Sequence, residues 1–202
     1  MGMYGIAQEQ TDRYAEPLAP AWDVGRPQRA IYELDVAGEI PRALLDVGCG
    51  TGEHALFLAG RGHVVCGVDP SARAVARAAR RARERQLPIA FVQEELTRLE
   101  RLGRSFDGAL DAGSFHRVEL GDRAEYARSL AAVVRPGGRL FVLCFGEHER
   151  GPGGPRRVTR AELCTVLEGA GLFRVDSIEA SLIESRGYPG GANGWLAKAT
   201  RR

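Results

Sequence analysis

Apolar and polar positions change their spacing repeatedly along this chain after residue 40. Short continuous apolar runs, typical of strands buried on both faces, alternate with longer segments in which apolar residues recur every three or four positions, as in amphipathic helices. This alternation predicts a largely parallel sheet covered by helices. The predicted strands are 43–47, 64–68, 89–92, 106–111 and 139–145, and the predicted helices are 29–37, 54–60, 72–86, 122–134 and 160–170.

The carboxyl-terminal part shows a different connection. Residues 173–183 and 193–199 both have strand patterns, and Gly187-Tyr188-Pro189-Gly190-Gly191 joins them. A connection this short cannot carry a parallel crossover, so the last pair is predicted to be antiparallel. Arg135-Pro136-Gly137-Gly138 predicts a helix stop and a tight turn before the fifth strand. The predicted fold class is therefore α/β: a Rossmann-like, seven-stranded, mostly parallel sheet with an antiparallel C-terminal strand and helices on both faces.

The segment before the first predicted core strand differs in character from the rest. Residues 1–40 are polar and aromatic and are interrupted by Pro17, Pro20 and Pro27. We predict an N-terminal helical lid segment at residues 1–40 and a single domain at residues 41–202. A chain of 202 residues is long enough to bury a substantial core.

Composition narrows the classes of partner. With 44% hydrophobic and 27% charged residues and a net charge of +2, the chain gives no electrostatic case for nucleic acid or an anionic membrane. No apolar run reaches membrane-spanning length, and the N-terminus lacks a secretory apolar region. The four cysteines are dispersed, which predicts reduced thiols in a cytoplasmic protein and no metal site. They are Cys49, Cys66, Cys144 and Cys164.

The chemistry begins after the first predicted strand, in Leu44-Leu45-Asp46-Val47-Gly48-Cys49-Gly50-Thr51-Gly52. A helix and a second apolar strand follow, and that strand ends in Asp69. Parallel topology sets the glycine turn and this carboxylate side by side at the carboxyl ends of neighbouring strands, where open α/β sheets bind ligands. Glycines let the backbone approach a ligand closely, and Asp69 is placed to accept hydrogen bonds from a ribose diol. The pattern predicts a nucleoside-containing cofactor.

The glycine spacing indicates which cofactor. The dinucleotide fingerprint is G-x-G-x-x-G, and the position of its third glycine holds Glu53 here. A carboxylate at that place would oppose a pyrophosphate but suits a cationic ligand. S-adenosylmethionine carries a sulfonium and no phosphate, so it fits the acidic set Asp46, Glu53 and Asp69 better.

This glycine run resembles the first motif of class I S-adenosylmethionine-dependent methyltransferases, and Asp69-Pro70-Ser71 resembles their next motif. The resemblance implies that Glu95, with Glu94 as its competitor, meets the adenine amino group, and that the Leu96 amide meets a ring nitrogen. It also implies that Asp111 meets the methionine ammonium, mainly through its backbone. The cofactor-binding residues implied in this way are Asp46, Gly48, Cys49, Gly50, Asp69, Pro70, Glu95, Leu96, Asp111 and Ala112, together with Trp22 and Arg26 in the N-terminal segment.

In that segment, Ala21-Trp22-Asp23-Val24-Gly25-Arg26-Pro27-Gln28 resembles small-molecule methyltransferases whose N-terminal segment folds over the cofactor. Trp22 would present its π face to the sulfonium, and Arg26 would pair with the cofactor carboxylate. The alternatives are an ordinary core tryptophan and a surface arginine.

The fourth predicted strand ends in Asp111-Ala112-Gly113-Ser114. Methyltransferases that act on planar nitrogens resemble one another here in Asn/Asp-Pro-Pro-Tyr/Phe, which this chain lacks. With Phe115-His116 and the later Arg135-Pro136-Gly137-Gly138, the run resembles the thiopurine and tellurite-resistance-like group, whose acceptors are small soft nucleophiles. His116 is the candidate general base, because an imidazole holds a proton near neutral pH; the alternative is a structural histidine. His148 ranks below it.

We therefore predict in-line methyl transfer from S-adenosylmethionine to a hydroxyl or thiol of a small aromatic or heterocyclic metabolite, with S-adenosylhomocysteine as product. A non-catalytic binding protein on the same fold is the alternative. A nicotinamide oxidoreductase would need the third glycine. The partner is a small-molecule acceptor rather than nucleic acid or membrane, and the protein is a monomer or homodimer. The acceptor itself is not encoded in a readable pattern.

Overall fold

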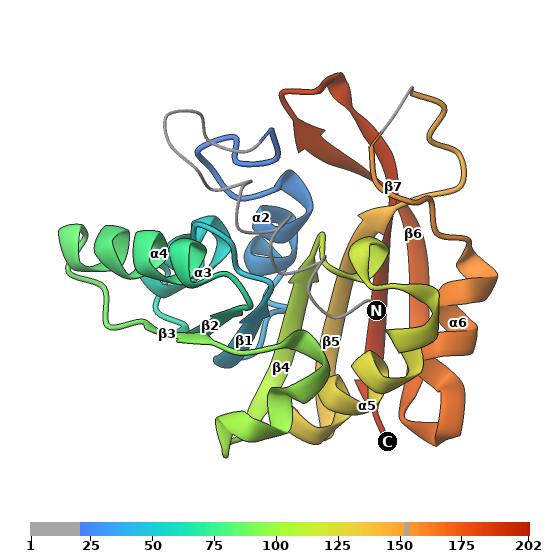
Figure 1. Ribbon diagram of the computed structural model, residues 1–202, viewed down its shortest axis with the longest axis horizontal. Coiled ribbons are helices and arrows are strands. Elements are labelled where there is room, and N and C mark those ends of the chain that lie inside the picture. Colours follow the sequence, from blue (N-terminus) through green and yellow to red (C-terminus); the bar gives the residue numbers. More distant parts are fainter. Residues whose placement is uncertain (1–20, 152–153) are drawn as a thin grey trace, which may run out of the picture.

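The computed structural model describes residues 21–151 and 154–202, and it centres on a seven-stranded sheet (Figure 1). The strand order is β3-β2-β1-β4-β5-β7-β6. The strands are β1 Ala43–Val47, β2 Val64–Asp69, β3 Ala90–Gln93, β4 Phe106–Ala112, β5 Val134–Phe145, β6 Phe173–Ser185 and β7 Tyr188–Arg201. The helices are α2 Arg29–Val36, α3 Glu53–Gly60, α4 Ala72–Glu84, α5 Arg123–Val133 and α6 Arg160–Glu168.

Five neighbouring strands are parallel and the last two close the sheet in the opposite sense. Strands β1 to β5 pair with one another in parallel, whereas β7 is antiparallel to both β5 and β6. Val47 pairs with Val68 on β2 and with Asp111 on β4, so these three strands end at the same edge. The predicted fold class and the antiparallel closing pair are confirmed.

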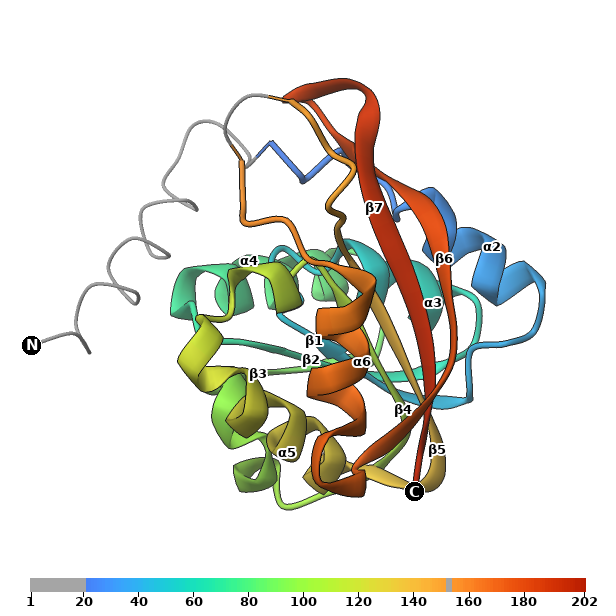
Figure 2. The ribbon, with the colours of Figure 1, turned by 90° about the vertical axis from the view of Figure 1, so that its right-hand side faces the viewer.

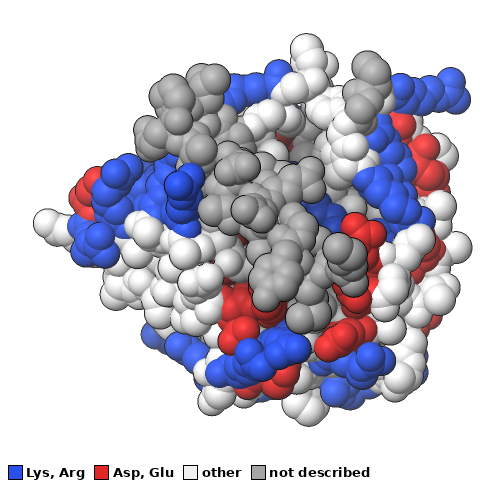
Figure 3. Space-filling model, viewed as in Figure 1, with Lys and Arg blue, Asp and Glu red and all other residues white. Residues whose placement is uncertain are grey.

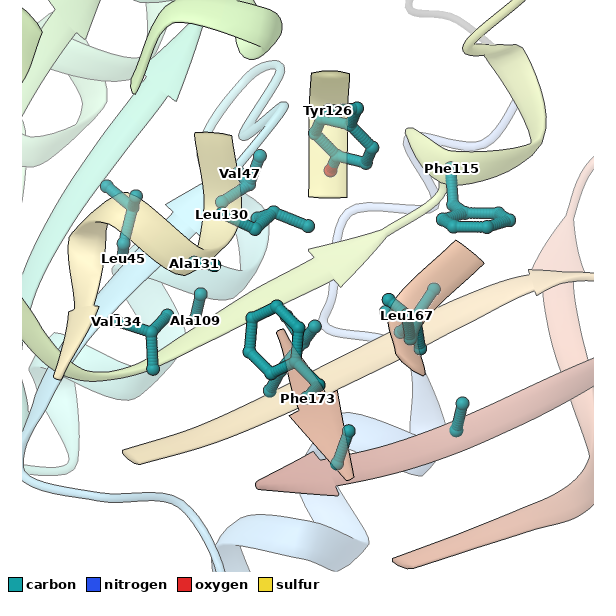
Figure 4. Close-up of a cluster of buried hydrophobic side chains, with 14 of the residues drawn as sticks. Leu45, Val47, Ala109, Phe115, Tyr126, Leu130, Ala131, Val134, Leu167 and Phe173 are labelled. Carbon is teal, nitrogen blue, oxygen red and sulfur yellow. The ribbon is translucent and has the colours of Figure 1, made fainter. Parts of the chain in front are cut away.

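The sheet is covered on both faces, as Figure 2 shows edge-on. Neighbouring apolar residues of β1 serve opposite faces, because side chains alternate along a strand. Leu45 belongs to a core under α5 and α6, with Leu130, Leu167 and Phe173 (Figure 4). Leu44 belongs to a second core with α2 and α3. This two-sided burial explains why β1 is apolar at every position except Asp46 rather than alternating.

Helix α4 buries only alanines, Ala74, Ala78 and Ala82. Its remaining positions are rich in arginine, and basic side chains gather over it on the face seen in Figure 3. This is the amphipathic pattern of a covering helix with a solvated outer face.

Three predicted details differ from the structure. Strands β6 and β7 extend to the pair Ser185 and Tyr188, so a turn of two residues, 186–187, replaces the predicted five-residue loop. Strand β5 begins at Val134, and residues 135–138 form an irregularity opposite Asp107 rather than a turn before the strand. Short 3₁₀ helices at Leu96–Leu102, Phe115–Arg117 and Leu120–Asp122 occupy connections in which no element was predicted.

Helix α2 is built into the domain core. Its Ile31 and Leu34 are buried in the same cluster as Leu44 of β1. Just before it, the Gln28 side chain accepts from the Glu184 backbone N–H at 2.7 Å and donates to the Glu184 carbonyl at 2.9 Å. Residues 1–20 of the predicted lid segment lie outside the described part of the chain. Among the described helices, none is long and apolar enough to cross a membrane.

Candidate active site

The loop between β1 and α3 adopts left-handed backbone conformations at its glycines. Gly48 has φ +67°, and a Cβ placed there would lie 1.8 Å from the Ser114 Oγ. A side chain at this position is therefore excluded by backbone strain and by collision. The Cys49 N–H donates to the Val68 carbonyl at 2.9 Å, which holds the loop against the end of β2.

Asp69 joins this loop to the next helix. One carboxylate oxygen accepts from the Gly50 N–H at 2.9 Å and the other accepts from the Ser71 N–H at 2.8 Å. Ser71 in turn caps α4 by accepting from the Ala74 N–H. Burial raises the pKa of Asp69, and the two backbone hydrogen bonds oppose that rise. Among the described residues each oxygen has one hydrogen-bond partner, which leaves it a second lone pair on a fixed carboxylate.

Two further acids are buried near the same edge. Asp46 accepts from the Ala55 N–H at 3.1 Å, and burial raises its pKa to about 7. Asp111 accepts from the Ser114 N–H at 2.6 Å and from the Tyr126 hydroxyl at 2.7 Å, and burial raises its pKa to about 6. Both carboxylates are engaged in ordering backbone turns, and the role of the Asp111 backbone toward a ligand stays a prediction.

Glu53 does not stand as an uncompensated charge. Its carboxylate is paired with the Arg81 guanidinium, which also donates to the Thr51 carbonyl at 3.0 Å. The predicted repulsion of a pyrophosphate by Glu53 is therefore weakened by an arginine that lies 28 positions away. The acidic character of the site rests on Asp46, Asp69 and Asp111 instead.

The end of β3 separates the two competing glutamates. The Glu94 carboxylate accepts from the Glu95 N–H at 3.0 Å and lies 3.7 Å from Arg101. The Glu95 side chain is exposed and, among the described residues, has no hydrogen bond or ion pair. Leu96 begins the following 3₁₀ helix and packs against the core. Glu95 is thus the glutamate that remains available for a ligand.

Pro70, which directly follows β2, is half-buried.

Beyond β4 the chain turns back over the sheet edge. Half-buried Ala112 ends the strand, and the Ser114 hydroxyl donates to the Val47 carbonyl at 3.3 Å. His116 follows and is 4% exposed, with its Nδ1 accepting from the Phe145 N–H at 3.3 Å. Because that N–H is a donor, the neutral ring carries its proton on Nε2.

The surroundings of His116 oppose the predicted role of general base. Burial, together with the positive charges of Arg123 and Arg157, lowers the pKa of His116 to about 3. Its one unprotonated nitrogen is already engaged. His148, the lower-ranked candidate, is exposed with its ring against Trp195.

The leader segment, residues 21–28, crosses this edge. The Asp23 carboxylate accepts from the Thr51 hydroxyl at 2.7 Å, which ties the segment to the glycine loop. The Arg117 guanidinium lies 4.2 Å from the centroid of the Trp22 ring, so a sulfonium on Trp22 would need the opposite face. Arg26 is 62% exposed and pairs with Glu184 at 2.7 Å. Pairing of Arg26 with a cofactor carboxylate stays a prediction, and it would require this ion pair to open.

Comparison with known proteins decides the family. Residues 44–138 match the family model described as methyltransferase domain. Over 196 residues the chain is 30% identical to 2-heptyl-1-hydroxyquinolin-4(1H)-one methyltransferase of Mycobacteroides abscessus, covering 89% of this chain and 86% of that relative. The chain belongs to the S-adenosylmethionine-dependent methyltransferases.

Two further similarities support the assignment of this methyltransferase. A probable thiol methyltransferase 2 of Arabidopsis thaliana is 32% identical over 173 residues, covering 83% of this chain and 75% of the relative. A solved structure described as "Conversion of a Disulfide Bond into a Thioacetal Group during Echinomycin Biosynthesis" superposes with a TM-score of 0.82. It is 28% identical and covers 96% of this chain and 89% of that one.

The residues at the sheet edge fit S-adenosylmethionine, the methyl donor of this family. Within the described residues each Asp69 oxygen accepts a single backbone N–H, which leaves it a lone pair for a diol, and the Gly50 backbone lies directly beside that carboxylate. Burial holds the pKa of Asp46, Asp69 and Asp111 above the usual carboxyl range. A nearby positive charge would favour their ionised forms, and the sulfonium of this donor would supply one.

Sequence reasoning missed Asp23, Thr51 and Arg117 as parts of this site. Thr51 lies inside the glycine motif, where its hydroxyl is a visible signal, but nothing local identifies Asp23 as its partner 28 positions away. Arg117 directly follows His116, yet arginine is so frequent in this chain that its position carried no signal.

Proposed function

We propose that this methyltransferase transfers a methyl group in line to an oxygen or sulfur of a small aromatic or heterocyclic metabolite, and that the acceptor enters already ionised. The supporting observation is the state of His116, which is neutral, buried and occupied at Nδ1. The names of two relatives agree with acceptors that ionise readily, because one contains an N-hydroxyl group and the other names a thiol.

An anionic acceptor removes the need for a base. Its lone pair forms a bond to the methyl carbon while the carbon–sulfur bond of the donor breaks and leaves its electrons on sulfur. No proton moves in this step. Holding the two reactants in line can itself contribute on the order of 7–11 kcal/mol. In this proposal the Nε2–H of His116 is a hydrogen-bond donor to the acceptor rather than a proton acceptor.

On the donor side, we assign binding roles that the geometry supports. Asp69 takes the ribose diol because its carboxylate is fixed by two backbone N–H groups. Glu95, whose carboxylate has no hydrogen bond or ion pair among the described residues, takes the adenine amino group, and the Leu96 amide takes a ring nitrogen. The backbone at Asp111 and Ala112 takes the methionine ammonium. Asp46 orders the loop through the Ala55 N–H.

The proposal extends to the N-terminal segment, the cellular location and the partners of the protein. The segment 1–40 would cover the donor, and its described part already crosses the glycine loop through Asp23. Free, buried Cys49, Cys66 and Cys144 agree with a cytoplasmic protein. A monomer or homodimer acting on a small molecule, with no nucleic acid or membrane partner, remains the proposal.

The test is a screen with labelled methyl donor against thiophenols, N-hydroxyquinolones and phenols, followed by rates against pH. We expect kcat/KM to rise with the ionisation of the acceptor, so the profile moves between two thiophenols of different measured thiol pKa. His116→Gln should keep that acceptor-dependent profile. A profile that is the same for every acceptor and disappears in His116→Gln would restore the general base. Tight binding of S-adenosylhomocysteine with turnover of no acceptor would favour the non-catalytic alternative.

A further inference from the structure

The arginines around the site differ in how their charges are compensated. Arg81 is paired with Glu53 and Arg123 with Glu162. Arg117 is half-buried, and within the described part of the chain its guanidinium has no hydrogen bond or ion pair. Its contact is the flat face of the Trp22 ring. A guanidinium stacked in this way keeps its in-plane N–H groups directed outward and available to an anion.

The position of Arg117 relates it to the reaction. It ends the 3₁₀ helix Phe115–Arg117 that follows β4, and its backbone N–H donates to the Ser114 carbonyl at 2.8 Å. Trp22 lies next to Asp23, which is bound to Thr51 in the glycine loop. The Arg117 side chain therefore connects the segment after β4 to the leader segment, beside the loop that holds the donor.

The local charge pattern also favours an anion here. Arg123 and Arg157 lie close enough to His116 to lower its pKa. The strand ends on the donor side instead carry Asp46 and Asp69. Buried carboxylates thus lie at the ends of β1 and β2, whereas cationic side chains lie beyond β4, where Arg123 is paired with Glu162 and, within the described residues, Arg117 has no ion pair.

We propose that Arg117 binds the ionised oxygen or sulfur of the acceptor and makes the enzyme select anionic over neutral acceptors. This inference rests on the proposed function, and it adds the specificity-determining residue. The guanidinium would supply charge-assisted hydrogen bonds to the anion, with Trp22 holding its plane.

The experiment compares wild type with Arg117→Gln and Arg117→Lys, using two thiophenols of different measured thiol pKa and a 1-hydroxyquinolin-4-one as probes. Binding of each probe to the protein saturated with S-adenosylhomocysteine is measured by calorimetry at pH values on both sides of the probe's pKa, and KM and kcat are measured in parallel. For Arg117→Gln we expect about tenfold weaker binding and about tenfold higher KM for the anions, with a smaller change in kcat. The preference for the anion over the neutral form should be lost, and Arg117→Lys should recover part of it.

Arg104→Gln is the matched control, because Arg104 is also stacked on an aromatic ring, 4.9 Å from the centroid of Phe106, at the opposite end of β4. It should behave like wild type. Equal losses for anionic and neutral forms, or weaker binding of S-adenosylhomocysteine in Arg117→Gln, would overturn the inference in favour of a structural role. Unchanged probe binding in Arg117→Gln overturns it while the proposed function stands. If wild type itself neither binds nor methylates any probe, both are contradicted.

Discussion

At the scale of single residues, one carboxylate connects two backbone segments that must meet the same ligand. Each oxygen of Asp69 accepts a backbone N–H, from Gly50 in the glycine loop and from Ser71 at the start of α4. An asparagine at this position would keep one oxygen acceptor. Its NH₂ group would replace the other oxygen and face a backbone N–H, so two donors would meet with no acceptor between them. A buried polar group left without its partner costs roughly 1–3 kcal/mol.

We therefore expect Asp69→Asn to raise the Kd of S-adenosylhomocysteine by about tenfold or more. The free energy of unfolding should fall by roughly 1–3 kcal/mol. Calorimetry measures the first and urea denaturation the second. Asp107→Asn, at the other end of the sheet where Asp107 pairs with Arg135, should leave the Kd at the wild-type value. An unaltered Kd in Asp69→Asn would remove this residue from the donor site.

Single residues also show where sequence reasoning stops. The glycine loop and Asp69 were predictable because their chemistry lies within one strand–turn–helix–strand unit. The state of His116 was not, because it depends on the Phe145 N–H 29 positions away and on the charges of Arg123 and Arg157. The pairing of Glu53 with Arg81 is likewise a tertiary contact.

At the scale of elements, β1, β2 and β4 each bring a buried acid toward one edge of the sheet. Burial, together with the charges of Asp69 and Asp111, raises the pKa of Asp46 to about 7. The native state then holds the proton of Asp46 more tightly than the unfolded chain does. Its contribution to stability is present at low pH and declines as the pH rises from about 4 to about 7.

Asp46→Asn tests whether the contribution of Asp46 to stability declines as the pH rises. Asparagine keeps an acceptor for the Ala55 N–H but cannot ionise, so the variant should gain stability relative to wild type as the pH rises from 4 to 8. The gain amounts to about 1.4 kcal/mol per unit of pKa shift, measured by urea denaturation at each pH. Asp176→Asn provides the opposite case. Burial acts to raise the pKa of Asp176, but hydrogen bonds from Thr200 and Arg174 lower it overall. The free energy of unfolding of wild type should therefore increase relative to that of Asp176→Asn as the pH rises. A difference between wild type and Asp46→Asn that is constant with pH would contradict the assignment.

The bounds of an element were predicted more accurately where its residues are more deeply buried. Strand β1 was predicted with its observed bounds because both faces are covered and its positions are apolar except for Asp46. The ends of β6 and β7 were missed because residues 188–191 are half-buried or exposed and have turn-type sequence, yet Tyr188 pairs with Ser185. Hydrogen bonding along the hairpin prevails over local preference there.

At the scale of the whole molecule, the leader segment joins three parts of the fold that are distant in sequence. The Ala21 carbonyl accepts from the Arg186 N–H at 2.8 Å in the β6–β7 turn, Trp22 stacks with Arg117 after β4, and Asp23 binds Thr51 after β1. A ligand in the glycine loop would therefore leave most easily when these contacts open.

Thr51→Val removes the hydroxyl that holds Asp23. We expect S-adenosylhomocysteine to dissociate about tenfold faster, which corresponds to the loss of one hydrogen bond to a charged group of ~1.5 kcal/mol. Stopped-flow tryptophan fluorescence would follow the dissociation. Thr165→Val, at an exposed position of α6, should dissociate the ligand at the wild-type rate. A rate equal to wild type in Thr51→Val would show that the leader segment does not retain the ligand.

The contact between Gln28 and Glu184 has a consequence for assembly. An outermost strand with free amide and carbonyl groups invites a strand from another molecule. Here the Gln28 amide uses both groups of Glu184, as a neighbouring strand would. Extension of the sheet by a second molecule is therefore blocked at this end of β6, which protects this edge from aggregation.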